Sequence, residues 1–100
     1  MDAFLALADP TRRRIIESLV DGESAFGDLA DQFNMSRPAV SQHLKVLRQA
    51  GLVHVRKDAQ RRIYRLNADG LDELGEWLDG VKNFWGARLD DLERALEDPN

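Results

Sequence analysis

The sequence predicts a mainly α-helical fold with one small β-hairpin. Apolar residues recur at spacings of three and four along most of the chain, which is the period of amphipathic helices. Two runs, "LVHVRK" and "RRIYRL", are instead rich in β-branched and aromatic residues, as strands are. An apolar stripe then continues from about Ala68 to Leu96. A length of 100 residues suits one compact domain, which we expect over residues 1–100.

Start and stop signals divide the first part of the chain into short helices. Asp9 is a suitable N-cap, and Pro10 follows at the first helical position, where its missing N–H group costs nothing. We expect this helix to end at Gly22. Ser24 is the expected cap of a further short helix, Ala25 to Phe33.

The next helix begins after a tight turn at residues 34–35. Ser36 is its expected N-cap, and the helix runs to about Ala50, with Gly51 as its stop. At about 100° per residue, its apolar positions fall on one face. That face must point inward, and its residues are Val40, Leu44 and Leu47.

The opposite face of this helix offers hydrogen-bond donors, acceptors and cations but no carboxylates. Glutamine can pair with adenine and arginine with guanine, whereas Ser and Lys are more permissive. These groups suit base edges and phosphates in a major groove. The alternative interpretation is an ordinary polar surface without a DNA-binding role. The predicted DNA contacts on the helix are Ser36, Arg37, Pro38, Ser41, Gln42 and Lys45.

The two β-type runs, about residues 52–66, are joined by residues 58–60 and predict a hairpin. Its tip carries Arg56, Lys57, Arg61 and Arg62, which can neutralise phosphates. Charge that merely keeps an edge strand soluble is the alternative, but glutamate would serve that purpose equally well. A helix-turn-helix at about residues 25–50, followed by a basic hairpin, is a winged helix-turn-helix.

Charge is distributed unevenly along the chain. The net charge is −4, which alone would argue against a nucleic-acid partner. However, residues 37–65 carry eight Lys/Arg and one Asp, whereas residues 66–100 carry three Lys/Arg and ten Asp/Glu. The basic block coincides with the predicted helix and hairpin, and this favours double-stranded DNA as the partner.

The segments "ALADPTRRRIIESL", "SRPAVSQHLKVLRQAGLV" and "RRIYRLN" resemble the ArsR-type bacterial winged-helix repressors. The resemblance covers about residues 3–67 well and the last helix in pattern only. It implies a homodimer that binds a palindromic operator and represses transcription. By resemblance, Arg37, Pro38, Ser41 and Gln42 match the groove-reading positions.

The sequence departs from the metal-sensing members of that family. Their cysteine pair would lie near Ala25 to Ala30, and this chain has no Cys. Their other common site uses His and carboxylates on the last helix, yet the two histidines here are His43 and His54. We therefore expect no metal and no cofactor. The inducing signal stays open, and an unknown small molecule or a protein inducer is possible.

The long last helix, about residues 68–96, predicts a dimer. Its apolar stripe is longer than the winged core can cover. The segment "MDAFLALAD" is expected to form a short first helix, which adds the apolar side chains of Phe4 and Leu5. Dimer core is favoured over an apolar pocket lined by Trp77, Phe84 and Trp85. The expected interface residues are Phe4, Leu5, Leu71, Leu74, Leu78, Val81, Trp85, Leu89 and Leu92.

Other classes of protein fit less well. Ser41 and His43 are two residues apart on a helix and do not face each other, and no phosphate-binding glycine loop is present, so an enzyme is not expected. A winged-helix protein-interaction module without DNA binding is the alternative, but such a module should lack the cations. The chain has no membrane-spanning run or signal pattern, and we expect it in the cytoplasm.

Overall fold

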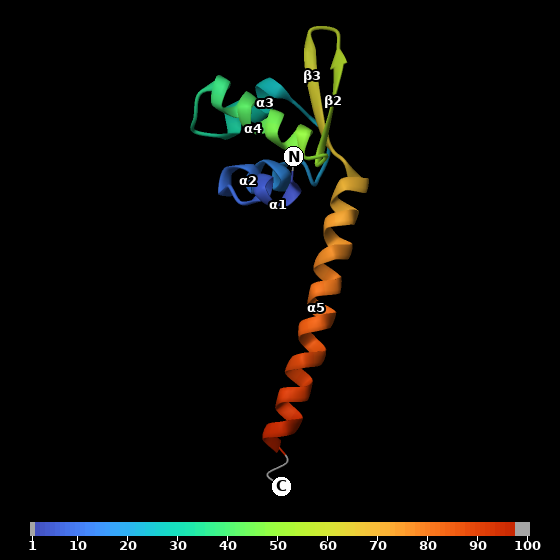
Figure 1. The fold of residues 1–100 in the computed structure, drawn as a ribbon. Coiled ribbons are helices and arrows are strands. Elements are labelled where there is room, and N and C mark those ends of the chain that lie inside the picture. Colours follow the sequence, from blue (N-terminus) through green and yellow to red (C-terminus); the bar gives the residue numbers. More distant parts are fainter. Residues whose placement is uncertain (1, 98–100) are drawn as a thin grey trace.

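The computed structural model describes residues 2–97; Met1 and residues 98–100 of the expected domain lie outside the described residues. The predicted fold class, mainly α with a small β-hairpin, is confirmed (Figure 1). In chain order the elements are α1 (Ala3–Leu7), α2 (Pro10–Ser18), β1 (Ser24–Ala25), α3 (Phe26–Gln32), α4 (Arg37–Gln49), β2 (Val53–Asp58), β3 (Arg61–Leu66) and α5 (Ala68–Glu97).

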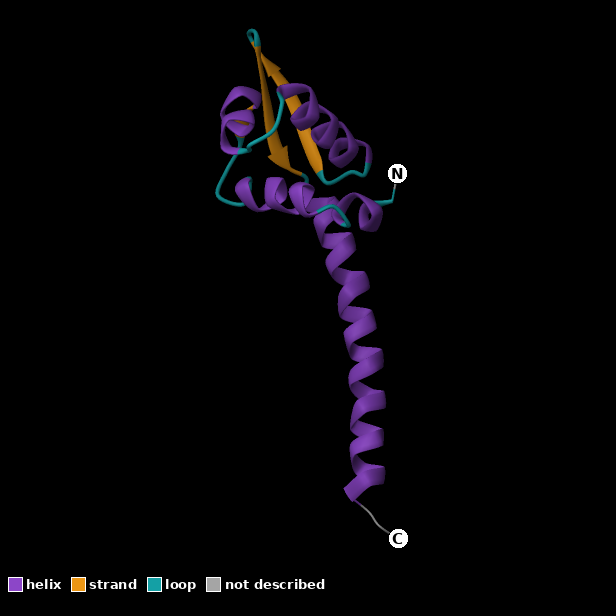
Figure 2. Ribbon diagram, turned by 90° about the vertical axis from the view of Figure 1, so that its left-hand side faces the viewer, coloured by secondary structure: helices purple, strands orange, loops and turns teal. Residues whose placement is uncertain are grey.

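The molecule has two parts. Helices α1–α4 pack with the sheet into a head, residues 2–67, and α5 leaves the head as a single long arm. The β2–β3 hairpin and the arm extend in opposite directions in both views of the ribbon (Figures 1 and 2). The resulting shape is elongated, with principal extents of 71 × 26 × 25 Å.

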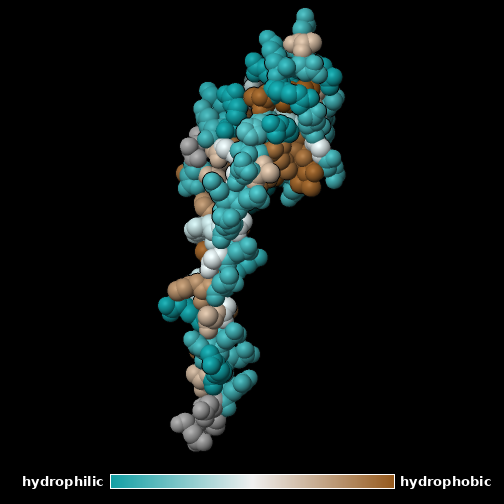
Figure 3. Space-filling view, turned by 90° about the vertical axis from the view of Figure 1, so that its right-hand side faces the viewer, coloured by the Kyte–Doolittle hydropathy of each residue, from teal (hydrophilic) through white to brown (hydrophobic). Residues whose placement is uncertain are grey.

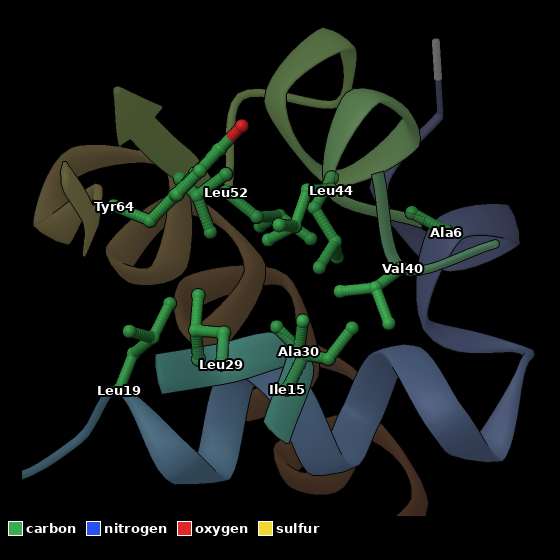
Figure 4. Packing of buried hydrophobic residues seen from close by; sticks show 11 residues of the cluster. Ala6, Ile15, Leu19, Leu29, Ala30, Val40, Leu44, Leu52 and Tyr64 are labelled. Atoms are coloured by element: carbon green, nitrogen blue, oxygen red, sulfur yellow. The ribbon is translucent and has the colours of Figure 1, made fainter. Parts of the chain in front are cut away.

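The hydrophobic core lies inside the head. Val40, Leu44 and Leu47 of α4 are fully buried, as their common helix face predicts, and Ile15 of α2 and Leu29 of α3 pack against them (Figure 4). Burying such side chains contributes about 1.5–3 kcal/mol each. The core therefore fixes which face of α4 points outward.

Side-chain caps stabilise the N-termini of α2 and α4 at the positions that the sequence predicts. Asp9 accepts hydrogen bonds from the backbone N–H groups of Thr11 (2.7 Å) and Arg12 (3.2 Å). Burial opposes ionisation of Asp9, but the hydrogen bonds from Arg12 and Thr11, with nearby His43 and Arg12, hold its pKa below the usual value. Ser36 accepts from the N–H of Ala39 (3.3 Å) and caps α4, as predicted.

Two expectations about the segment between α2 and α3 are wrong. Helix α2 ends at Ser18, before the expected stop at Gly22. Ser24 is not a helix cap; it lies in β1 and pairs with Tyr64 of β3, so the hairpin is part of a three-stranded antiparallel sheet of order β1-β3-β2. The free edge of β3 offers backbone partners to this extended segment, and α3 begins after it without a side-chain cap.

Candidate nucleic-acid interface

The predicted contacts on α4 all lie on its exposed face. The buried positions of the helix are Val40, Leu44 and Leu47, and the remaining side of the helix is turned away from the core. The exposed residues are Ser36, Arg37, Pro38, Ser41, Gln42 and Lys45. Arg37 lies 3.7 Å from Asp31 of α3, but both side chains are largely exposed, so water screens this pair.

The predicted contacts on the wing, which is the β2–β3 hairpin, are also exposed. In the register of the two strands, Lys57 lies opposite Arg62, and Asp58 lies opposite Arg61. A short turn joins the strands, with Ala59 in the left-handed region (φ 57°). This register gathers three cations around a single carboxylate at the tip of the wing.

A groove joins the exposed polar face of α4 to the wing. It has a volume of about 640 Å³ and is lined by Arg37 and Ser41 of α4, by Arg61 and Arg62 of β3, and by residues of α3. The fold therefore brings together, on one concave side of the head, residues that are about twenty positions apart in the sequence. Such a surface can follow a phosphate backbone while α4 faces the base edges.

Arg56 differs from the other wing cations because a carboxylate neutralises it. Its Nη2 donates to Oε1 of Glu23 (2.7 Å), and its Nη1 donates to the other carboxylate oxygen. The hydrogen bond from Arg56 lowers the pKa of Glu23, and the same hydrogen bond raises the pKa of Arg56. At the tip of the wing, the positive charge is thus carried mainly by Lys57, Arg61 and Arg62.

Two residues that the sequence analysis did not select also line this surface. Arg48, near the end of α4, lies beside Lys57 and Arg62 in one hollow of about 450 Å³ and beside Lys45 in a smaller one. Tyr64 of β3 is buried, yet it lines both hollows and the groove. Arg48 follows Lys45 by three residues on the same helix, which is a signal that could have identified it.

His43 points elsewhere. Its Nδ1 lies 3.3 Å from Nη1 of Arg12, whose Nη2 also donates to the carbonyl of Leu5 (3.3 Å). The imidazole is half-buried between α4 and α2 and is not part of the outward face. Within residues 2–97, no group of three or more His, Cys, Asp or Glu side chains is arranged to hold a metal ion.

Most of the arm is uncovered. Leu78, Trp85, Leu89 and Leu92 are between 43% and 60% exposed, although Leu71, Leu74 and Val81 are partly shielded. In α1, Phe4 and Leu5 are 42% and 66% exposed. Phe4 packs edge-on against Trp77 with ring centroids 4.7 Å apart. The space-filling view shows hydrophobic and polar patches side by side along the arm, which nothing covers on this face (Figure 3).

The head therefore has the architecture of a winged helix-turn-helix DNA-binding domain, with an exposed polar helix face beside a basic two-stranded wing. The model of the arsR family of bacterial regulatory proteins matches residues 9–55. The chain is 52% identical, over 95 residues, to the HTH-type transcriptional regulator Rv2034 of Mycobacterium tuberculosis, covering 95% of this chain and 86% of that protein. It is 38% identical to the transcriptional repressor SdpR of Bacillus subtilis, covering 77% and 86%.

The solved structure of a possible transcriptional regulator for arsenical resistance superposes with a TM-score of 0.77 at 41% identity, covering 100% of this chain and 98% of that one. The chain belongs to the ArsR family. It is a winged helix-turn-helix transcriptional regulator that binds DNA, and the family and these relatives are regulators rather than enzymes. No helix within residues 2–97 is long and apolar enough to cross a membrane.

Proposed function

We propose that this regulator is a homodimeric repressor that binds an imperfect palindromic operator, with one α4 and one wing per half-site. The observation that carries the proposal is the exposed apolar stripe of the arm, which a second copy would cover. Several relatives carry the word repressor in their names, SdpR and the arsenical resistance operon repressor of Staphylococcus xylosus among them.

The proposed dimer is supported by the apolar surface that the arm leaves exposed to water. A helix of 30 residues spans about 45 Å, and from Leu78 onward its larger apolar side chains are mostly exposed. A two-fold axis would pair this patch with itself, and α1 would add Phe4 and Leu5 at the edge of the seam. We propose the interface as Phe4, Leu5, Leu71, Leu74, Leu78, Val81, Trp85, Leu89 and Leu92, with Trp77 added because it contacts Phe4.

The DNA contacts divide by role. Arg37 and Gln42 are proposed to read bases, because their planar groups can make paired hydrogen bonds to guanine and adenine. Ser36, Pro38, Ser41 and Lys45 are proposed to contact the DNA around these two residues. Lys57, Arg61, Arg62 and Arg48 are proposed to bind phosphates, whereas Arg56 would have to leave Glu23 to do so. With one α4 per protomer, the half-site centres lie about one helical turn apart, or a multiple of that.

Residues 1–100 are proposed to act as one domain in the cytoplasm, with the helix-turn-helix at about 25–50, the wing at about 52–66 and the dimerisation helix at about 68–96. Metal sensing is not proposed, because the chain lacks the cysteine pair and the last-helix histidines of that class. Either a small organic molecule or a partner protein is the proposed kind of inducer.

Substitutions in α4 and the wing test the proposal. Gln42→Ala should weaken binding to the cognate operator by about 5- to 150-fold, the equivalent of ~1–3 kcal/mol for a lost base contact, and should barely change binding to random DNA. Gln49→Ala, two turns further along α4, is the matched control. Arg61→Ala with Arg62→Ala should weaken both DNAs and flatten the salt dependence. Equal losses of Gln42→Ala on cognate and random DNA would contradict a base-reading role.

A further inference from the structure

Asn67, the residue just before the arm, makes two hydrogen bonds to the segment that follows α4. The N–H of Asn67 donates to the carbonyl of Leu52 (2.9 Å), and Nδ2 of Asn67 donates to the carbonyl of Gly51 (2.8 Å). Gly51 itself ends α4 in a left-handed conformation (φ 77°), and Leu52 is fully buried in the core. These bonds tie the start of α5 to the short segment that directly follows α4.

Gly70 makes this contact possible. A Cβ atom at Gly70 would lie 2.0 Å from the carbonyl oxygen of Gly51 and 3.0 Å from its carbonyl carbon. Both atoms belong to the backbone of Gly51, so no flexible side chain can move aside to make room for a Cβ atom. The same oxygen also accepts the hydrogen bond from Asn67, which holds it in place. At Gly75, Gly80 and Gly86, the other glycines of α5, nothing lies within 4 Å of such a Cβ. Close approach therefore explains glycine at position 70 alone.

Little else sets the direction of the arm. Leu71 packs against the core, and Trp77 touches Phe4, but beyond these first turns the side chains of α5 are largely exposed. Figure 1 shows the arm leaving the head at the base of the hairpin and running free below it. The angle between α4 and α5 is thus decided where α5 starts.

We propose that Gly51, Leu52, Asn67 and Gly70 form a rigid joint that sets the angle between the arm and α4, and through it the spacing of operator half-sites. In this proposal Gly70 and Asn67 are positioning residues, because they contact Gly51 and Leu52 and act on the DNA contacts through α4. The inference rests on the proposed dimer, in which the arms hold the two heads together.

The length of the arm makes this angle consequential. With about 45 Å of helix, a tilt of about 10° at the joint moves the far end by about 8 Å relative to the head. That displacement exceeds two base-pair steps of about 3.4 Å each. In a dimer held along the arms, a small opening of the joint would therefore move the two recognition helices out of register with a fixed operator.

A spacing series of operators tests the joint. Gly70→Ala, which forces the contact apart, should weaken the native operator by at least about tenfold, because the two half-sites no longer bind together. It should also shift the preferred spacing by one base pair or more, while binding to random DNA stays the same. Gly80→Ala, the same change on the outer face of α5, should keep the native spacing and affinity. An unchanged spacing preference for Gly70→Ala would overturn the proposal.

A DNA-independent measurement separates the joint from the dimer. The chain has no Cys, so Gln49→Cys on exposed α4 gives a single spin-label position per protomer. The distance between the two labels should be narrow in the otherwise unchanged protein, displaced by Gly70→Ala, and broadened by Asn67→Ser, which is too short to reach Gly51. If Gly70→Ala fails to fold, Asn67→Ser still tests the joint. Identical distance distributions would refute the joint with the dimer intact, and the absence of any distance between labels would refute the dimer and, with it, the joint.

Discussion

Leu89→Ala is the substitution that most directly tests whether the apolar stripe of the arm forms the dimer interface. Leu89 is 60% exposed in the single chain, so it contributes little to the stability of the head. Burying the rest of a leucine side chain against a partner contributes about 1–2 kcal/mol, at ~1.5–3 kcal/mol for complete burial. Alanine removes most of that, and the two-fold axis repeats the loss. We expect a loss of about 1.5–3 kcal/mol per dimer, or about 10- to 150-fold in the dimer dissociation constant.

Sedimentation equilibrium over a range of concentrations gives this constant directly. Asp90→Ala is the matched control, because it lies one position further on α5, about 100° round the helix and away from the apolar stripe. The melting temperature of the head should be the same in both variants. A dissociation constant for Leu89→Ala within threefold of that for Asp90→Ala would show that a second copy does not cover this stripe.

Four further outcomes are expected. Ending the chain after Asn67 should give a monomer or an aggregate with weak operator binding, by sedimentation and gel shift. Zinc, arsenite and cadmium should not release the operator; a stoichiometric release that a chelator reverses would contradict this. Glu23→Gln should free Arg56 at neutral pH and steepen the salt dependence of binding to random DNA by close to one charge. Asp9→Ala should lower the free energy of unfolding by about 1 kcal/mol. The stabilisation by Asp9 should be fully present above the usual pKa range of a carboxyl group, and melting curves at a series of pH values should show its loss as the pH falls through the lowered pKa of Asp9.

The helix that faces DNA could be predicted because its signals are local. Each signal that bounds α4 lies within a few residues of the end that it marks: the side-chain cap at Ser36, the proline in the first turn, and the glycine at position 51. The buried stripe has the helical period, so the outward face follows by exclusion. The same reasoning located the wing, since its two strands are adjacent in the chain.

Features made by distant segments could not be predicted in this way. Ser24 is a good cap in isolation, but the edge of β3, some forty residues later, draws it into a strand. Glu23 and Arg56 are 33 residues apart, and no local pattern pairs them. Gly70 resembles any other glycine on α5 until its distance to Gly51 is known. In each case the deciding contact forms only when the head is assembled.

The charge of the arm explains how a chain of net charge −4 can bind DNA. Residues 37–65 carry a net charge of +7 and form α4 and the wing, whereas residues 66–100 carry −7. The arm leads away from the wing in a molecule 71 Å long, and the Debye length at physiological salt is about 8 Å. Most acidic side chains of α5 are therefore screened from the groove and cannot cancel its attraction for phosphate. They also repel any duplex that approaches the arm itself, so DNA is steered to the head and the apolar stripe of α5 remains available for contact with protein.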